Sequence, residues 1–192
     1  GQCSEQISSI RSSAQQHLAQ QHLHELNAHT EPLILIPTGG SSGHIRFAIH
    51  TWETLTASVM AARAYFQIDR LHSCCILPLF HVSGLMQFMR SFLTDGRLAL
   101  FAAKELELQV HQINPSEFFL SLVPTQLQRL LHTPQNLPWL SRFHTILLGG
   151  APAWTELLDL ARSHHIRLAP TYGMSETASQ VATLKPEDFL AG

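Results

Sequence analysis

Residues 144–173 read HTILLGGAPAWTELLDLARSHHIRLAPTYG, and this stretch decides the predicted fold. The apolar run 144–152 predicts a strand that ends in a glycine turn, 154–165 predicts a helix, and 166–173 predicts a second strand. A strand, a helix and a strand at this spacing form a crossover unit, which joins parallel strands. The stretch therefore predicts an α/β fold.

Short apolar runs alternate with amphipathic stretches from Leu33 onward. The other strands that we expect are residues 33–37, 45–51, 74–79, 97–102 and 118–124. The other helices that we expect are residues 53–67, with Thr51 as the N-cap, 84–94 and 125–133. Because continuous apolar strands are typical of parallel sheets covered on both faces, the sequence predicts a mainly parallel sheet flanked by helices. Ligands of such open sheets bind at the carboxyl ends of the strands.

The composition excludes several classes of protein. Of the 192 residues, 45% are hydrophobic and 14% are charged, which is typical of a folded chain rather than a disordered one. The net charge is −2 and no Lys/Arg cluster exists, so we expect no nucleic-acid partner. No apolar run approaches the ~20 residues of a membrane span. An odd number of cysteines (Cys3, Cys74 and Cys75) gives no disulfide framework, so we expect a cytoplasmic protein.

The first 32 residues differ in amino-acid composition from the rest of the chain. They are polar and rich in Gln, His and Ser, and their few apolar residues have a weakly helical spacing. We therefore expect residues 1–32 to form a polar helical N-terminal segment, and residues 33–192 to form the α/β portion.

A segment of small and hydroxyl-bearing residues, PTGGSSGHIR (37–46), joins two of the predicted strands. Residues of this kind let backbone N–H groups converge on an anion, and Arg46 can add a permanent positive charge. The segment is neither a Walker loop nor a G-x-G-x-x-G loop. A flexible hairpin loop explains the same residues equally well.

A second segment, YGMSE (172–176), follows a predicted strand and combines an aromatic ring, a hydroxyl and a carboxylate. The ring of Tyr172 can stack on a purine, and a Glu176 oxygen can ligate magnesium beside phosphates. An ordinary polar turn after a strand is the alternative interpretation.

A third segment, LLGGAP (147–152), ends a predicted strand with two glycines. Glycines at a strand end let a ligand approach the backbone closely. A tight turn in which Pro152 opens the next helix is an equally good interpretation.

A fourth segment, PLFHVSG (78–84), places His81 between an apolar strand and a helix. A histidine in apolar surroundings is more often structural than functional. Its position at the carboxyl end of a strand favours a functional role here.

The order of these four segments, at these separations, resembles the adenylate-forming superfamily of acyl-CoA synthetases, luciferases and peptide-synthetase adenylation domains. Within it, PTGGSSGHIRFAIHTW and LPLFHVSGLMQ are similar to the o-succinylbenzoate–CoA ligases of the cyanobacterial kind. The resemblance runs from Leu33 to the end of the chain, so it implies that residues 33–192 are the nucleotide-binding α/β portion of an adenylation domain.

The resemblance implies a reaction in two steps. ATP and a carboxylate give an acyl-adenylate and pyrophosphate, and coenzyme A then displaces AMP to form a thioester. The implied ligands are therefore a small-molecule carboxylate, ATP, Mg²⁺ and coenzyme A, and the implied role is in menaquinone or phylloquinone synthesis. The alternatives are an acyl- or aryl-CoA ligase with another substrate, a non-catalytic nucleotide-binding module, and a structural domain with coincidental loops.

The resemblance also implies roles for individual residues. The resemblance implies that the phosphates of ATP are bound by Thr38, Gly39, Gly40, Ser41, Ser42 and Gly43. Arg46 stands where the family usually has a lysine. Adenine and the α-phosphate are bound, by the same resemblance, by Tyr172, Gly173, Met174 and Ser175, and magnesium is bound by Glu176. The adenine and acyl pockets are walled by Gly149, Gly150, Ala151 and Pro152. His81 borders the acyl site and joins Ser175 and Glu176 as a catalytic candidate, and Ser83 and Thr171 are polar contacts for the substrate.

The family's hinge, its ribose-binding aspartate and the lysine of its C-terminal lid have no counterpart in this chain. We therefore expect a central fragment of the large domain that folds and binds nucleotide weakly. We expect that this fragment does not complete thioester formation.

Overall fold

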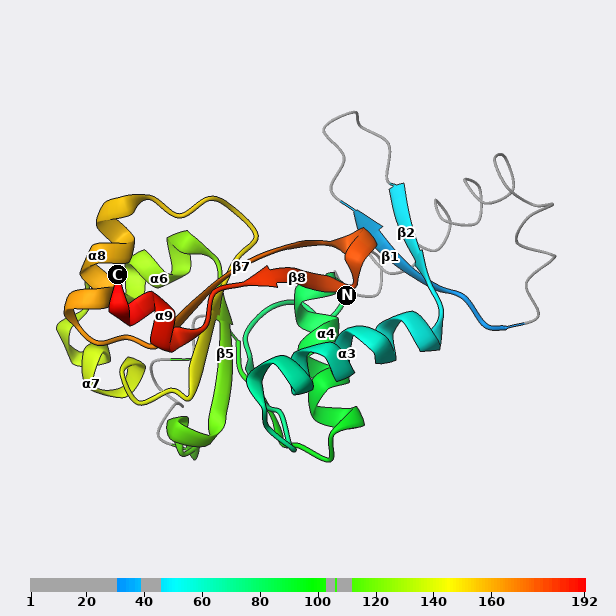
Figure 1. Ribbon diagram of the computed structural model, residues 1–192, viewed down its shortest axis with the longest axis horizontal. Helices are drawn as coiled ribbons and strands as arrows, with labels where there is room; N and C mark the ends of the chain where they lie inside the picture. Colours follow the sequence, from blue (N-terminus) through cyan, green and yellow to red (C-terminus); the bar gives the residue numbers. More distant parts are fainter. Residues whose placement is uncertain (1–30, 39–45, 103–105, 107–111) are drawn as a thin grey trace.

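The computed structural model describes residues 31–38, 46–102, 106 and 112–192. Its centre is a six-stranded sheet with the strand order β4-β3-β5-β6-β7-β8 (Figure 1). The strands are β3 (His72–Cys75), β4 (Leu98–Leu100), β5 (Phe118–Leu122), β6 (Thr145–Leu148), β7 (Leu168–Met174) and β8 (Ser179–Thr183). Every pairing is parallel except that of β7 with β8. The predicted mainly parallel α/β fold is confirmed.

Helices cover both faces of this sheet. On one face lie α6 (Pro124–Leu131), α7 (Leu137–Leu140), α8 (Thr155–Ser163) and α9 (Pro186–Ala191), and on the other lie α3 (Trp52–Phe66) and α4 (Val82–Leu93). Three short 3-10 helices, η2 (Pro115–Glu117), η3 (Pro134–Asn136) and η4 (Ser175–Thr177), lie between these elements. In the part of the chain that the structure describes, no helix has the length and apolar character needed to cross a membrane.

Strand β5 shows why this sequence forms a central strand. All five of its residues are buried, because the strand is covered on both faces. Phe118, Leu120 and Leu122 point into the core beneath α6, α7 and α8. Phe119 points the opposite way and packs with Leu71 and its neighbours. The period of two along a strand therefore divides one apolar run between two cores.

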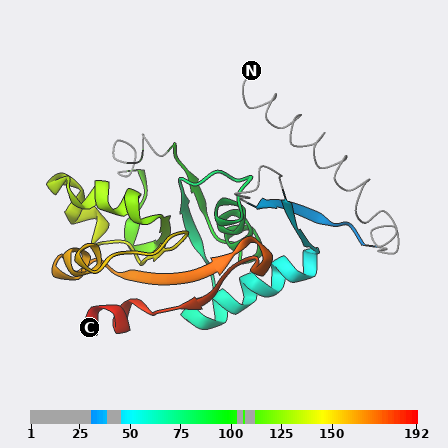
Figure 2. The same ribbon diagram turned by 90° about the horizontal axis from the view of Figure 1, so that it is seen from above.

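An antiparallel hairpin stands apart from the main sheet. It consists of β1 (Ile34–Thr38) and β2 (Arg46–His50), whose last paired residues are Thr38 and Arg46. The hairpin packs on α3, α4 and the turn between β7 and β8 through a core that includes Ile36 and Ala178. Seen from above, β7 and β8 run as one ribbon from the main sheet to this hairpin (Figure 2). The ribbon thus joins the two sheets.

Most of the predicted elements are present, with shifted ends. Thr51 caps α3, as predicted: its side chain accepts a bond from the Thr54 N–H at 3.2 Å, and the two residues form a capping box. The predicted strand 97–102 shortens to β4, although the Phe101 N–H still donates to the Cys75 carbonyl of β3 at 3.0 Å. The expected N-terminal segment 1–32 lies almost wholly outside the described residues.

Two predictions about element boundaries are wrong. The strand expected at 74–79 is β3 and ends at Cys75, because Pro78 cannot donate to a ladder and its carbonyl instead accepts the His81 N–H in a turn. The helix expected at 84–94 begins at Val82. The helix predicted at 154–165 is present as α8, which begins at Thr155 with Trp154 as its N-cap, so the alternative in which Pro152 opens a helix is excluded. Strand β8 and helix α9 were not predicted at all.

Candidate active site

A cavity of about 350 Å³ lies where the parallel strands end. It is bounded by the segment after β3, the end of β5, the end of β6 and the second half of β7. The strand order reverses between β3 and β5, since β4 lies on one side of β3 and β5 on the other. Such a switch point leaves a crevice at the carboxyl edge of a sheet, which is where ligands of open α/β folds bind.

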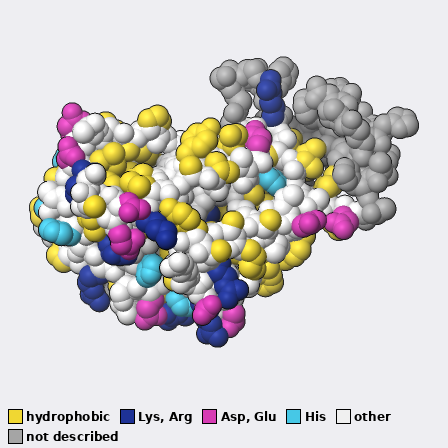
Figure 3. Space-filling model, viewed as in Figure 1, with side chains coloured by type: hydrophobic (Ala, Val, Ile, Leu, Met, Phe, Trp, Pro, Cys, Tyr) yellow, Lys and Arg dark blue, Asp and Glu magenta, His cyan; other side chains and the backbone are white. Residues whose placement is uncertain are grey.

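A second, wider cavity of about 680 Å³ adjoins the first. Gly150, Thr171 and Gly173 line both cavities, so only a thin wall of backbone separates them. In the space-filling view, hydrophobic side chains gather over β7 and the loop before α8, whereas charged side chains lie mainly on the lower side of the molecule (Figure 3). Two adjoining cavities suit a ligand with two parts.

The sequence-predicted residues divide between these cavities. The first cavity is lined by His81, Ser83, Gly149, Gly150, Thr171, Gly173, Met174 and Ser175. The second is lined by Gly150, Ala151, Pro152, Thr171, Tyr172 and Gly173. Three of the four segments that the sequence analysis singled out therefore meet at one edge of the sheet.

The fourth segment is described only at its ends. Gly39, Gly40, Ser41, Ser42 and Gly43 lie outside the described residues, so their predicted phosphate contacts stay predictions. Thr38 and Arg46 close the hairpin on either side of them, and neither lines the two cavities. The hairpin itself confirms the strands that the sequence predicts around this loop.

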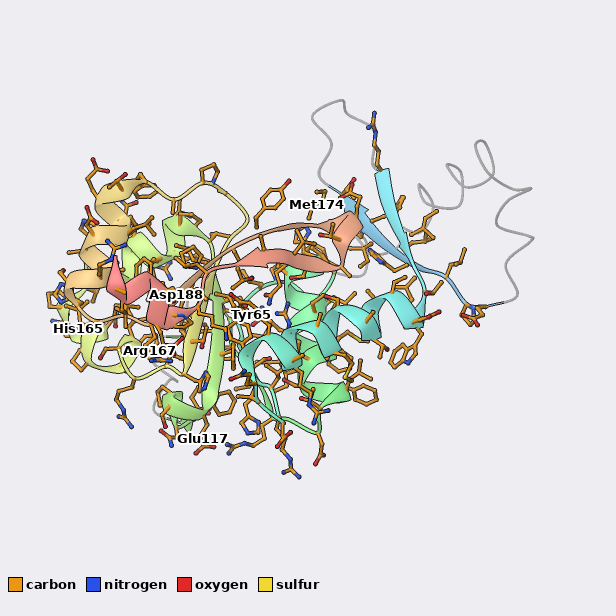
Figure 4. All side chains as sticks on the ribbon, in the orientation of Figure 1. Tyr65, Glu117, His165, Arg167, Met174 and Asp188 are labelled. Carbon is orange, nitrogen blue, oxygen red and sulfur yellow. The ribbon has the colours of Figure 1, made fainter. Side chains whose placement is uncertain are left out.

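The segment Tyr172–Glu176 leaves the sheet at an irregularity in the β7–β8 pairing. The register shifts between Tyr172 and Gly173, and a Cβ on Gly173 would lie 2.0 Å from the Ser179 carbonyl oxygen. Only glycine therefore allows β8 to approach this closely. Beyond it, Met174 lies at the far end of the ribbon (Figure 4). The side chain of Tyr172 is 64% exposed, so its ring is free to contact a ligand in the second cavity.

The end of β6 forms the wall between the cavities. Gly150 has a φ of +81°, a backbone conformation that favours glycine. A Cβ on Gly149 would lie 3.0 Å from the Thr171 carbonyl oxygen, so this glycine lets β6 approach β7 closely. The Thr171 hydroxyl donates to the Ala182 carbonyl and accepts from the Thr183 hydroxyl, both at 3.1 Å. These bonds fix Thr171, the part of the wall that β7 supplies, to β8.

His81 lies at the mouth of the first cavity. It is the N-cap residue of α4, and its exposed ring packs on the ring of Phe80 with a centroid distance of 4.5 Å. The chain turns sharply here, since a Cβ on Gly84 would lie 2.2 Å from the Pro78 carbonyl oxygen. An exposed histidine at the rim of a cavity can change its orientation without disturbing the core.

Arg90 is a residue of the first cavity that the sequence analysis missed. Its side chain is 4% exposed, and its guanidinium donates to the Ser179 hydroxyl and the Gln180 side-chain oxygen, both at 3.2 Å. Its Nε has no partner, and no carboxylate pairs with it in the described part of the chain. Burial lowers the pKa of Arg90 to about 10, well above neutral pH, so the group stays charged.

One signal in the sequence points to Arg90. It lies four residues after the buried Met86, so helical periodicity places a cation on the inner face of α4. A buried cation is costly unless an anion or polar groups surround it. Arg90 therefore has the position and the unused hydrogen-bonding capacity to bind an anionic ligand.

The donor set for a metal fits magnesium held mainly by phosphates. Glu176 is exposed on η4, between the ribbon and the hairpin, and forms no ion pair among the described residues. No group of three or more His, Cys, Asp or Glu residues gathers within the described ranges. Mg²⁺ is usually bound by one or two carboxylates together with substrate phosphates, and Glu176 can supply one carboxylate.

A parallel α/β sheet with a two-part cavity at its switch point defines a nucleotide-binding type of fold. The sequence matches the family model of the AMP-binding enzyme over residues 2–191. The chain therefore belongs to the AMP-binding enzyme family.

The particular relatives share one description. The 2-succinylbenzoate–CoA ligase of Bacillus subtilis is 38% identical over 155 residues, which cover 80% of this chain and 32% of that enzyme. The 2-succinylbenzoate–CoA ligase of Listeria monocytogenes is 32% identical over 157 residues, which cover 80% of this chain and 33% of that enzyme. The chain thus spans about a third of the length of these relatives.

Solved structures agree with this result. The o-succinylbenzoate coenzyme A synthetase of Bacillus subtilis in complex with AMP superimposes with a TM-score of 0.69 at 28% identity, covering 82% of this chain and 33% of that one. The same enzyme in complex with ATP and a magnesium ion gives a TM-score of 0.67 at 28% identity, covering 80% and 32%. The superposition confirms the adenylate-forming fold for this chain.

Proposed function

We propose that the protein carrying this chain is a ligase that activates 2-succinylbenzoate with ATP and transfers the acyl group to coenzyme A. In the first step, a substrate carboxylate attacks the α-phosphorus and pyrophosphate leaves. In the second step, the coenzyme A thiolate attacks the acyl carbon and AMP leaves. The shared description of the relatives supports this substrate, and Arg90 is the structural observation that carries it.

A substrate with two carboxylates needs a cation in its pocket. One carboxylate of 2-succinylbenzoate becomes the acyl-adenylate, and the other stays ionised at neutral pH. An ionised group in a closed pocket is stable only when it is paired. Arg90 has no acidic partner in the described part of the chain, and it lines the first cavity beside Leu77, Val82 and Leu147. A cation among apolar side chains suits an aromatic ring that carries a carboxylate.

The remaining contacts follow from the two cavities. The first cavity holds the acyl group, with His81, Ser83, Gly149 and Thr171 around it. The second cavity holds the nucleoside, with the exposed ring of Tyr172 against adenine and Gly150, Ala151 and Pro152 as its floor. Ser175 lines the first cavity and Gly173 lines both, so the α-phosphate lies where the cavities meet. Thr38, Arg46 and the loop between them hold the outer phosphates.

Positioning and charge neutralisation account for the chemistry. The attacking carboxylate is already ionised, so the first step needs no general base. The protein instead aligns the carboxylate with the α-phosphorus and places hydrogen-bond donors where negative charge develops. The Ser175 hydroxyl donates to the α-phosphate, and Glu176 holds Mg²⁺, which neutralises phosphate charge when bound. His81, at the rim, borders the acyl group in both steps.

The proposal extends to the setting of the enzyme. We place it in menaquinone or phylloquinone synthesis, as a cytoplasmic protein without a nucleic-acid partner. Two free cysteines, Cys74 and Cys75, lie buried in the core, which suits a reducing compartment. We assign the nucleotide-binding part to residues 33–192 and a polar N-terminal segment to residues 1–32.

Pyrophosphate exchange across a panel of carboxylates tests the proposal. The whole protein that carries this chain should exchange pyrophosphate into ATP with 2-succinylbenzoate, and much less with benzoate or a long-chain fatty acid. Exchange with fatty acids alone would overturn the substrate and keep the family. Exchange with no carboxylate, together with ATP binding, would favour a nucleotide-binding module. Glu176→Gln should abolish exchange and keep nucleotide binding, since it removes a magnesium ligand and keeps the shape of the side chain.

A further inference from the structure

Two side chains of the N-terminal half reach across to the turn that follows β7. His50, the last residue of β2, donates from Nε2 to the Ser175 carbonyl oxygen at 2.7 Å. Ser58, on α3, donates from its hydroxyl to the Ala178 carbonyl oxygen at 2.7 Å. These bonds hold both ends of η4, which carries Glu176, to the hairpin and its neighbouring helix.

The turn that these bonds hold is strained. Ala178 has a φ of 51° and Ser179 has a φ of 91°, a region that residues other than glycine rarely adopt. Strain of this kind persists only where surrounding contacts over-determine the backbone. Apolar contacts contribute as well, because Ala178 is buried in the same core as Ile36 and Leu55. The hairpin and α3 therefore impose the conformation of η4.

The histidine at position 50 is well suited to hold a carbonyl group. It is 4% exposed, so its bond to Ser175 is shielded from water. A carbonyl oxygen only accepts, so Nε2 must carry a proton. The other ring nitrogen, Nδ1, lies 3.2 Å from the Thr54 hydroxyl, which orients the ring. No part of His50 lines either cavity.

We propose that His50 and Ser58 are positioning residues that hold the Ser175–Glu176 turn in register with the hairpin of the phosphate loop. The proposal rests on the proposed function, because it assigns the hairpin and the turn to one ATP molecule. Residues that lie far apart in the sequence then keep one arrangement around the triphosphate and its metal. Neither side chain touches the nucleotide. Their loss weakens ATP binding more than carboxylate binding, because only Met174, Ser175 and Ser179 of the turn line the acyl cavity.

Amide hydrogen exchange of the 192-residue chain tests the positioning role without any ligand. In His50→Leu, the segment 174–179 should exchange about tenfold faster, because the Ala178 N–H bonds to the same Ser175 carbonyl that His50 holds. His50→Gln should restore slow exchange, since its amide can donate in place of Nε2. His144→Gln, which alters a half-buried histidine remote from the turn, is the matched control.

A second variant keeps the test decisive if His50→Leu does not fold. Ser58→Ala removes the bond to Ala178 and leaves the histidine in place, so it should speed exchange over the same segment. Unchanged exchange in Ser58→Ala and in any folded His50 variant would overturn the positioning role.

Pyrophosphate exchange by the whole protein gives the functional readout. In His50→Leu, KM for ATP should rise about tenfold and KM for the carboxylate should rise less, because the turn supplies only part of the acyl cavity. His50→Gln should recover most of the loss. A fall in kcat with unchanged KM for ATP would show a purely structural role and contradict the proposal. If the unsubstituted protein exchanges with no carboxylate, the proposed function fails, and the hydrogen-exchange result still decides whether His50 holds the turn.

Discussion

Replacing Arg90 by methionine should separate substrate recognition from stability. Methionine has a similar length and no charge, so it fills the same space in α4. The lowered pKa of Arg90, about 10 against an ordinary 12.5, corresponds to a desolvation cost of about 3 kcal/mol in the folded state. The two hydrogen bonds to Ser179 and Gln180 offset a similar amount. The free energy of unfolding should therefore change by no more than about 1 kcal/mol.

The same substitution should strongly weaken the binding of a dicarboxylate. Leaving a buried charge without its partner costs about 2–5 kcal/mol, which corresponds to roughly 30-fold or more in affinity. The loss should fall on KM for 2-succinylbenzoate, because the second carboxylate takes no part in the chemical step. KM for ATP should stay unchanged, since Arg90 lines the first cavity and not the second.

Pyrophosphate exchange with two substrates measures this effect. The ratio of kcat/KM for 2-succinylbenzoate to that for an analogue lacking the second carboxylate should fall at least tenfold in Arg90→Met. Thermal unfolding should show a Tm within about 4 °C of the unsubstituted protein. An equal loss for both substrates, or a large fall in Tm, would refute the assignment of Arg90 as the anion-binding residue.

Three further predictions concern stability. Gly173→Ala should lower the free energy of unfolding by about 3 kcal/mol or more, because the new Cβ would lie 2.0 Å from the Ser179 carbonyl oxygen. Urea unfolding measures this loss, and a value below about 1 kcal/mol would contradict the close approach of the two strands. Thr51→Ala should cost about 1 kcal/mol by removing the N-cap of α3, whereas Thr51→Ser should cost little. Burial lowers the pKa of His144 in the folded protein below the ordinary value of 6.5, so the unfolded chain takes up a proton at higher pH than the folded chain. The free energy of unfolding should therefore fall as the pH drops from about 7 to about 5. It should fall less steeply in His144→Gln.

Much of the fold could be predicted because its signals are local. The apolar run of β5 and the capping residue Thr51 act within a few residues of themselves, and both predictions are confirmed. Strand β8 gave no such signal, since it is half-exposed and pairs with β7 at a register shift that depends on Gly173. Its position is set by a partner strand and not by its own composition.

The candidate site shows the same division. Tyr172, Gly150 and His81 could be found because each lies in a segment at or just beyond the carboxyl end of a predicted strand, and parallel strands end at one edge. Arg90 was missed because it lies in the middle of a helix, where its spacing from Met86 indicates the inner face of the helix but not a ligand. His50 was missed because the carbonyl that it holds lies 125 residues further along the chain.

By itself, the sequence determined the alternation of strands and helices, the mainly parallel sheet and three of the segments that meet at its edge. Periodicity, capping and glycine placement are properties of neighbouring residues, so they can be read without coordinates. Only the tertiary structure decided that Arg90 is buried without an acidic partner in the described chain, and that His50 and Ser58 hold the turn carrying Glu176. Burial and long-range hydrogen bonds depend on which segments pack together, and that packing is a property of the whole folded chain.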